Sequence, residues 1–162
     1  MAKLISSIEV IDKAFLMGNI DTSLITDTYI EVSQEEHIRP ILTKDLYNLI
    51  VTENDSQVFT GSNSTLLNDY IKPALAFFVA ADILIHLAIR TTNKGLMVNT
   101  SETSQSATRE ERIDIMTRYK EQGNTMLEKM QRYLDDNLTT FPLYQNGSSA
   151  TITTNLKGGI IL

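Results

Sequence analysis

Residues Ile71–Thr92, IKPALAFFVAADILIHLAIRTT, decide the fold, because they predict a helix that is apolar on nearly every side. A surface helix shows one apolar stripe, whereas a helix that is apolar all round must be covered by protein or lipid. Asp82, His86 and Arg90 interrupt the run before it reaches the roughly 20 apolar residues that a membrane span needs. We therefore expect other protein to surround this helix, including neighbouring copies or partners.

Length and composition favour one packed domain. With 162 residues, 42% of them hydrophobic, the chain is long enough for one core and too short for two. It contains no cysteine, which excludes disulfides and metal sites built on thiolates. The net charge is −6, and the acidic excess lies in residues 1–60, which hold 4 Lys and Arg against 10 Asp and Glu. An acidic chain lacks the basic surface of a protein that grips nucleic acid.

Capping residues and apolar spacing predict an all-α fold of about five helices packed around the central one. The helices are expected over residues 7–17, 26–37 and 44–52, from residue 64 or 65 to a stop at Gly95, and over 108–136, with a loop at 53–64. Pro73 either kinks the central helix or marks its first turn. Thr43 is expected to cap the helix over residues 44–52. Thr108 and Glu111 match a capping box, and Gly123 permits a bend or a close helix approach.

The composition changes to Thr, Ser, Gly and Asn after the last helix. We expect an extended C-terminal arm over residues 137–162, outside a helical domain of residues 1–136. Asn146-Gly147 is a turn signal that would join Phe141–Tyr144 to Ser149–Thr154 as a short β-hairpin. The apolar Gly-Gly-Ile-Ile-Leu segment is expected to dock on a partner. The residues expected to bind partners are Thr151, Ile152, Thr153, Ile160, Ile161 and Leu162.

Asp82, His86 and Arg90 follow one another at four-residue steps, which places them on one face of the predicted central helix. One interpretation is a catalytic dyad or proton relay that uses Asp82 and His86. The other, which we favour, is a structural polar ladder that is buried and satisfied or lies at a subunit contact.

Asp27, Glu31 and Glu35 form a second set at four-residue steps. Like charges at this spacing repel one another by a few tenths of a kcal/mol per pair. The set is either a solvated face or an acidic stripe that lines a DNA channel or meets a basic partner.

Motifs of the common enzyme classes are absent from the sequence. It has no cysteine nucleophile, no G-x-S-x-G elbow, no P-loop and no G-x-G-x-x-G. Glu35-Glu36-His37 does not match the zincin motif H-E-x-x-H. The inverted motif H-x-x-E-H needs a histidine at position 33, where this chain has Ser33. The sequence therefore gives little support to nucleophilic hydrolase chemistry, and we expect no metal site.

Residues His37–Leu49, HIRPILTKDLYNL, resemble a segment of the helical head-tail connector proteins of tailed bacteriophages, also called adaptor or head-completion proteins. In that family an early helix is followed by a short link and a "Leu-Gly…Leu-Tyr" helix, then by a long alanine-rich apolar helix and a further helix. Leu46-Tyr47, Ile71–Ala76 and the helix end Thr91–Gly95 fit this pattern, and Thr43 stands where the family often has Gly. The chain looks most similar to the versions found in crAss-like phages.

The resemblance covers about residues 5–136. It implies a ring, usually of twelve copies, that docks beneath the portal and around the DNA exit channel of the virion. The implied partners are further copies of the chain, the portal protein and a tail-side or next ring protein. The resemblance also implies no enzymatic activity and no cofactor. DNA would pass through without specific binding, and no membrane is involved. The protein would be made in the host cytoplasm and reside in the virion at the head-tail interface.

Two other interpretations stay open at this point. The first is another virion ring or tail-completion protein of similar helical design. The second, from a different class, is a small helical enzyme or ligand-binding protein that uses Asp82 and His86.

Overall fold

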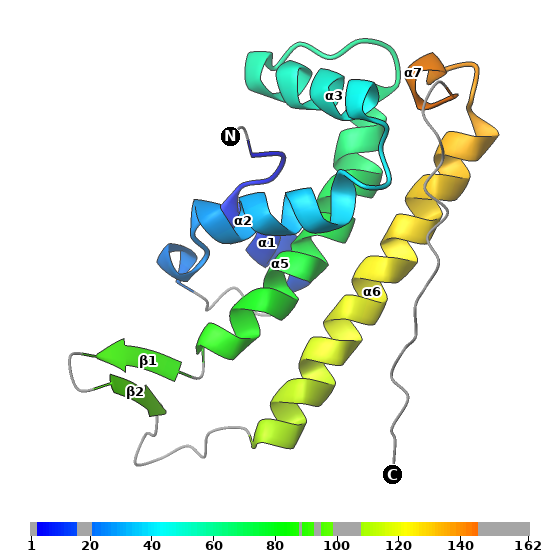
Figure 1. Ribbon diagram of the computed structural model, residues 1–162. Helices are drawn as coiled ribbons and strands as arrows, with labels where there is room; N and C mark the ends of the chain where they lie inside the picture. The colour runs from blue at the N-terminus through cyan, green and yellow to red at the C-terminus, as the bar shows by residue number, and fades with distance from the viewer. Residues whose placement is uncertain (1–2, 16–20, 88, 93–94, 99–107, 146–162) are drawn as a thin grey trace.

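The fold is all-α, as predicted, and is built around one long central helix (Figure 1). The structure is a computed structural model that describes residues 3–15, 21–87, 89–92, 95–98 and 108–145. Its helices are α1 (Ser7–Ala14), α2 (Asp27–Ser33), α3 (Lys44–Ser56), α4 (Asn63–Thr65), α5 (Lys72–Leu87), α6 (Arg109–Asp136) and α7 (Pro142–Gln145). A 3₁₀ turn covers Thr22–Leu24, and π-helical turns cover Gln34–Ile38 and Leu66–Ile71. Strands β1 (Ile89–Thr92) and β2 (Gly95–Val98) form a small antiparallel hairpin.

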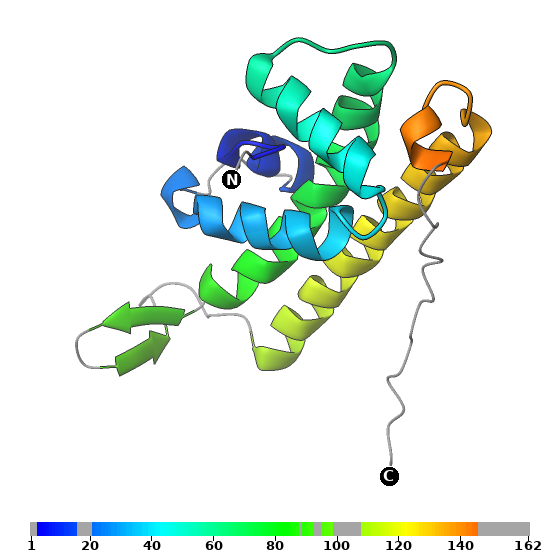
Figure 2. The ribbon, with the colours of Figure 1, turned by 45° about the horizontal axis from the view of Figure 1, so that its top comes forward.

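Helix α5 lies at the centre of the core. The long helix α6 runs beside it, and α1 and α2 cross it (Figures 1 and 2). Its side chains are buried in every direction, including Leu75, Ala76, Val79 and Ala80, which are 0% exposed. Burial of a leucine or valine side chain contributes roughly 1.5–3 kcal/mol, so this helix supplies much of the driving force for folding. The prediction that protein surrounds the apolar helix is confirmed for residues 71–84, which the chain's own helices cover. Contact of this helix with neighbouring copies or partners stays a prediction.

The central helix begins as α4 and accommodates Pro73 by widening the turn before it. Pro73 has no backbone N–H, and its ring would clash with the carbonyl of Asp69 in a regular α-helix. The chain forms a π-helical turn over Leu66–Ile71, and the N–H of Lys72 donates to the carbonyl of Leu67. The proline therefore sits in the first turn of α5, immediately after this π-helical turn.

Gly123 allows α6 to approach α5 closely. A Cβ at this position would lie 2.8 Å from Cζ of Phe78, and 2.9 Å from both of its Cε atoms. On its other side, the Phe78 ring stacks on His37, with ring centroids 3.8 Å apart. Phe78 thus fills the space between a bare backbone and an imidazole, and the predicted close approach at Gly123 is confirmed.

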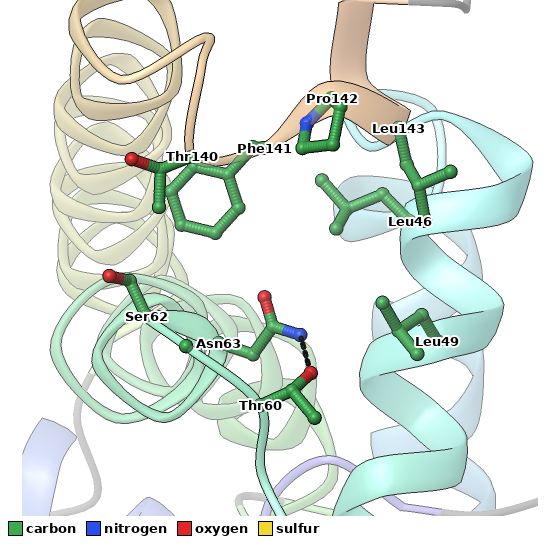
Figure 3. A pocket seen from close by; sticks show the side chains of 10 residues that line it. Leu46, Leu49, Thr60, Ser62, Asn63, Thr140, Phe141, Pro142 and Leu143 are labelled. Atoms are coloured by element: carbon green, nitrogen blue, oxygen red, sulfur yellow. Dashed lines mark hydrogen bonds between the residues drawn. The ribbon is translucent and has the colours of Figure 1, made fainter.

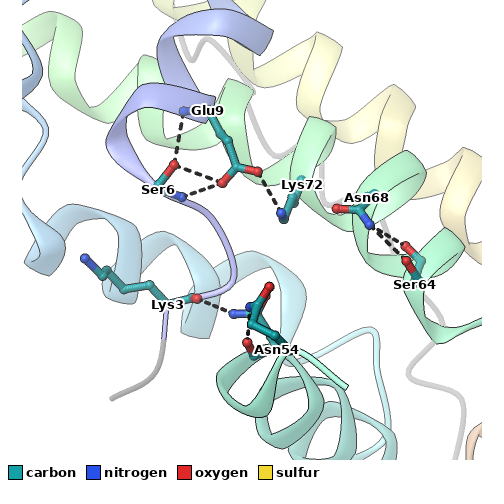
Figure 4. A network of polar contacts seen from close by, with 8 residues as sticks. Lys3, Ser6, Glu9, Asn54, Ser64, Asn68 and Lys72 are labelled. Atoms are coloured by element: carbon teal, nitrogen blue, oxygen red, sulfur yellow. Dashed lines mark hydrogen bonds and ion pairs between the residues drawn. The ribbon is translucent and has the colours of Figure 1, made fainter. Parts of the chain in front are cut away.

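Polar contacts attach the N-terminal segment to the rest of the core (Figure 4). Ser6 and Glu9 form a capping box at the start of α1, and Glu9 also pairs with Lys72 at 2.7 Å. Burial raises the pKa of Glu9, but the hydrogen bonds from Lys72 and Ser6 outweigh it and lower the pKa. The amide of Asn54 donates to the carbonyl of Lys3 at 2.8 Å, which joins α3 to the segment before α1. The N-cap of α1 is Ser6.

A buried hydrogen-bond chain joins the π-helical turn after α2 to α3. The carbonyl oxygen of Gln34, which is 0% exposed, accepts from the N–H of Leu4 at 2.9 Å. The amide group of Gln34 donates to the Tyr47 hydroxyl at 2.7 Å. That hydroxyl donates to Glu35 at 2.8 Å. Burial, together with this donation to Glu35, raises the pKa of Tyr47 to about 12. Gln34 and Tyr47 are thereby satisfied inside the core.

Helix α3 is longer than predicted, because its polar end is held by buried contacts. The sequence predicts a loop from residue 53, whereas α3 continues to Ser56. Gln57, the residue after the helix, adopts the left-handed conformation (φ 55°). Glu53 is only 6% exposed and accepts hydrogen bonds from Thr60 and from Asn63, the latter at 2.8 Å. The carboxylate therefore fixes the short connection to α4. The predicted N-cap of α3, Thr43, is confirmed by its acceptance from the N–H of Leu46.

The central helix ends earlier than predicted. The sequence predicts helix to Thr92 and a stop at Gly95, but α5 ends at Leu87, and Ile89–Thr92 form β1. Thr92 pairs with Gly95 in the hairpin. The β-branched side chains at positions 89, 91 and 92 favour a strand over a helix, which explains the change.

The predicted C-terminal hairpin is wrong over its first half. Phe141–Tyr144 was expected to be a strand, but Pro142 begins the short helix α7, a position that suits its fixed φ and missing N–H. Phe141 and Tyr144 are buried, and the Thr43 hydroxyl donates to the carbonyl of Leu143 at 2.7 Å. Burial of the two aromatic rings against the core outweighs the weak strand preference. The second half of the predicted hairpin lies outside the described residues.

Candidate interaction surfaces

The acidic residues predicted to form a stripe are found on and just after α2, and two of them are paired. Asp27 forms an ion pair with Lys3 at 2.7 Å. Glu35 forms an ion pair with Arg39 and accepts from the Tyr47 hydroxyl. Partial burial raises the pKa of Glu35, but the bonds from Arg39 and Tyr47 outweigh it and lower the pKa. The stripe is therefore not a row of three uncompensated carboxylates.

A shallow acidic surface remains on the outer side of α2. We call it the α2 acidic face; it is formed by Glu31, Val32, Glu35 and Glu36 around a hollow of about 470 Å³. Val32 is the apolar member of this set and is 53% exposed. The surface combines an exposed apolar side chain with flanking carboxylates.

The predicted polar ladder is not a single helical face. Asp82 accepts a hydrogen bond from the hydroxyl of Ser33 at 2.9 Å, which joins α5 to α2. His86 lies in the last turn of α5, and its side chain lies outside the described part of the structure. Arg90 is in β1, because the helix ends before it, so the four-residue spacing does not place it above His86. Of the three residues, Asp82 has a described contact, and that contact is structural.

A groove opens between α1, α5 and the N-terminal half of α6. We call it the α1–α6 groove, and its volume is about 390 Å³. Its lining residues are Lys13, Ala14, Phe77, Ile115, Arg118, Tyr119 and Gln122. Tyr119 contacts Phe77 and Phe15, with ring centroids 6.1 Å and 5.8 Å apart. Ile115 is 44% exposed. The groove therefore combines an apolar lining with two cationic side chains, those of Lys13 and Arg118.

A small crevice lies at the opposite end of α6, between α3, α4 and α7 (Figure 3). Its volume is about 230 Å³, and its apolar lining includes Leu46, Leu49, Phe141 and Leu143. Asn63 donates to Thr60 at 3.3 Å on its polar side. The crevice is where α7 closes the end of the core.

His37 is a half-buried titratable group that the sequence did not single out for a structural role. It stacks on Phe78, and burial lowers its pKa, with Lys120 acting in the same direction and Glu36 and Asp82 opposing it. A histidine whose folded pKa is depressed binds a proton more readily in the unfolded chain. The fold should therefore lose stability as the pH falls below about 6.5, until the folded pKa is passed.

We predict that His37→Phe removes part of this pH dependence. The parent should be His86→Gln, because the chain has only two histidines and His37 is then the one left to titrate. Urea unfolding between pH 7.5 and 5.5 should show a falling free energy of unfolding for the parent, by at most about 1.4 kcal/mol per pH unit from one histidine. The His37→Phe variant should show a shallower fall. Equal slopes for the two proteins would mean that His37 titrates normally in the fold.

The residues expected to bind partners, Thr151–Thr153 and Ile160–Leu162, lie outside the described residues. Within the described part of the chain, no group of three or more His, Cys, Asp or Glu is arranged to hold a metal ion. Among the helices described, none has the length and hydropathy required to cross a bilayer.

Comparison with known proteins gives one family. No curated protein matches the chain, and no solved structure matches it. A family model described as "Family of unknown function (DUF6712)" matches residues 38–154, which is more than half of the chain. The match begins at the end of the π-helical turn after α2 and includes α3, the whole central helix, α6 and α7. The protein therefore belongs to the DUF6712 family.

Proposed function

We propose that the protein is a structural component of a tailed-phage virion: a head-tail adaptor whose copies form a ring, of twelve by resemblance, between portal and tail. The supporting observation is the order and packing of its helices. An early helix, a short link, the helix with Leu46-Tyr47, the long alanine-rich helix and a further helix follow one another as in the head-tail connectors. Three residues of the segments that carry the resemblance lie in the core, with Leu46 and Tyr47 each 2% exposed and Ile71 0% exposed. The helix end expected at Thr91–Gly95 is not among them, because Thr92 lies in β1 and Gly95 in β2.

The charge of the chain suits a protein beside DNA that does not hold it. Its net charge is −6, and binding of the phosphate backbone depends on Lys and Arg. Lys3 and Arg39, two of the four basic residues in the first 60 residues, are engaged by Asp27 and Glu35. A ring with this composition would let DNA pass through its channel without specific binding.

The interaction surfaces favour assembly over catalysis. The described residues present a groove with an apolar lining and an acidic face, and Asp82 is engaged with Ser33. In the proposed assembly the portal binds one side of the ring, and a tail-side or next ring protein binds the other.

The test is co-assembly with the portal protein encoded by the same genome. The purified protein and portal should be mixed, and the mass of the complexes measured by mass photometry. We expect portal particles whose mass increases by several copies of the 18.2 kDa chain, with a plateau when the ring is complete. If the portal mass stays unchanged and the protein stays monomeric, the adaptor proposal is wrong. Rings that form without binding the portal would instead indicate another virion ring or tail-completion protein.

A further inference from the structure

The α1–α6 groove and the α2 acidic face are complementary in charge and polarity. The groove has an apolar surface of Phe77, Ile115 and Tyr119 beside the cationic Lys13 and Arg118. The acidic face has one exposed apolar side chain, Val32, with carboxylates on either side of it. Apolar contact area at the centre with opposite charges around it is the arrangement of specific protein interfaces.

The two surfaces lie on different sides of α5. Phe77 faces the groove, and Asp82 contacts α2 through Ser33. These two residues of α5 are five positions apart, so they project about 140° apart around the helix axis at ~100° per residue. Val32 and Glu36 are exposed on the far side of α2, while Ile30 and Ser33 are buried beneath them. One copy cannot place its own α2 acidic face in its own groove.

Part of the apolar lining of the groove is open to solvent. Ile115 is 44% exposed and lines the groove together with Phe77 and Tyr119. Ile115 and Tyr119 are four residues apart on α6, so they lie on the same face of the helix. The groove therefore has an apolar area that a partner would cover.

We propose that the α1–α6 groove binds the α2 acidic face of a second copy of this chain. Val32 of one copy contacts Ile115 and Tyr119 of the next, and Glu36 lies near Lys13 and Arg118. Because two different surfaces meet, the contact is heterologous, and repetition of it closes into a ring or continues as a filament. The inference rests on the proposed ring assembly and names the surfaces that join its copies.

Charge reversal on each surface tests the contact. The groove variant is Lys13→Glu with Arg118→Glu, and the face variant is Glu31→Lys with Glu36→Lys. Each variant alone should lose self-association by about tenfold or more, measured by sedimentation at low salt. An equimolar mixture of the two should recover association, because every reversed groove then meets a reversed face, and this recovery excludes misfolding as the cause. The control variant is Lys44→Glu with Asp55→Lys, which reverses exposed charges elsewhere and should associate normally.

Disulfide trapping tests the geometry independently. The chain has no cysteine, so introduced cysteines report one contact each. A chain with Val32→Cys and Gln122→Cys should form a ladder of covalent oligomers on oxidation, whereas either single variant should stay monomeric on a denaturing gel. Cross-linking of a single variant would indicate that like surfaces meet, and the inference would be wrong.

The outcomes separate this inference from the proposed function. If the parent protein associates, or binds the portal as a ring, but the reversed variants and the cysteine pair show no effect, the ring is real and the surfaces named here are wrong. If the parent protein neither self-associates nor binds the portal at any concentration used, both the inference and the adaptor proposal are wrong.

Discussion

Gly123→Leu is expected to unfold the protein or to lower its free energy of unfolding by more than about 3 kcal/mol. A Cβ at this position would lie 2.8 Å from Phe78, and the Phe78 ring has His37 stacked behind it. The ring therefore has no space to move into, and insertion of a larger side chain forces strain into a close-packed core. Leucine is a good helix former, so the loss would not come from helix propensity.

The matched control is Asn124→Leu, at the next position of α6, where the side chain is exposed. It should change the free energy of unfolding by no more than about 0.5 kcal/mol. Phe78→Ala in the Gly123→Leu background should recover part of the loss, because the new leucine occupies the volume of the ring. Urea denaturation followed by circular dichroism measures all three. Equal stability of Gly123→Leu and Asn124→Leu would mean that α5 and α6 do not pack at this distance.

Removal of residues 148–162 is expected to abolish binding to the portal while the helical domain stays folded. The last core residues before the cut are Phe141 and Tyr144, which are 2% and 6% exposed, and the Thr43–Leu143 hydrogen bond secures α7. The truncated chain keeps all of these. The deleted segment contains the apolar Ile160, Ile161 and Leu162, which the sequence assigns to partner binding.

Thermal unfolding should give the same midpoint for the truncated and the full chain, and co-sedimentation with portal should be lost. A full-length variant with Ile160→Asp and Ile161→Asp should lose co-sedimentation in the same way, whereas Asn155→Ser should retain it. A truncated chain that still co-sediments at the parental level would show that the C-terminal arm does not bind the portal.

Local patterns in the sequence were sufficient to predict the central helix and the starts of α3 and α6. The central helix was evident because its apolar residues occupy every face, and the caps at Thr43 and Thr108 were evident because a hydroxyl precedes each helix. The capping box of Thr108 with Glu111 forms as predicted. Gly123 was evident because a glycine interrupts an otherwise regular stripe. Each of these features depends on residues within one or two helical turns.

Features that depend on distant partners were not predictable in this way. The end of α3 depends on Glu53 reaching Thr60 and Asn63, and α7 depends on the burial of Phe141 against the core. The buried chain through Gln34 and Tyr47 joins three segments of the sequence, and no local pattern marks it.

The candidate interaction surfaces were only partly predictable. Glu31 and Glu35 were picked out by their spacing, but their pairing and the exposed Val32 between them depend on what packs against α2. The α1–α6 groove is formed by three helices that are distant in sequence. Apolar spacing alone does not show which apolar residues of α6 remain uncovered, such as Ile113 and Ile115.

The most direct test of the account is electron microscopy of the portal mixed with this protein. End-on averages of the complex should show an additional closed ring coaxial with the portal, and side views should show one added layer around the channel exit. Portal particles without added density, in a mixture where the protein is folded and in excess, would contradict the proposal that this chain is a head-tail adaptor.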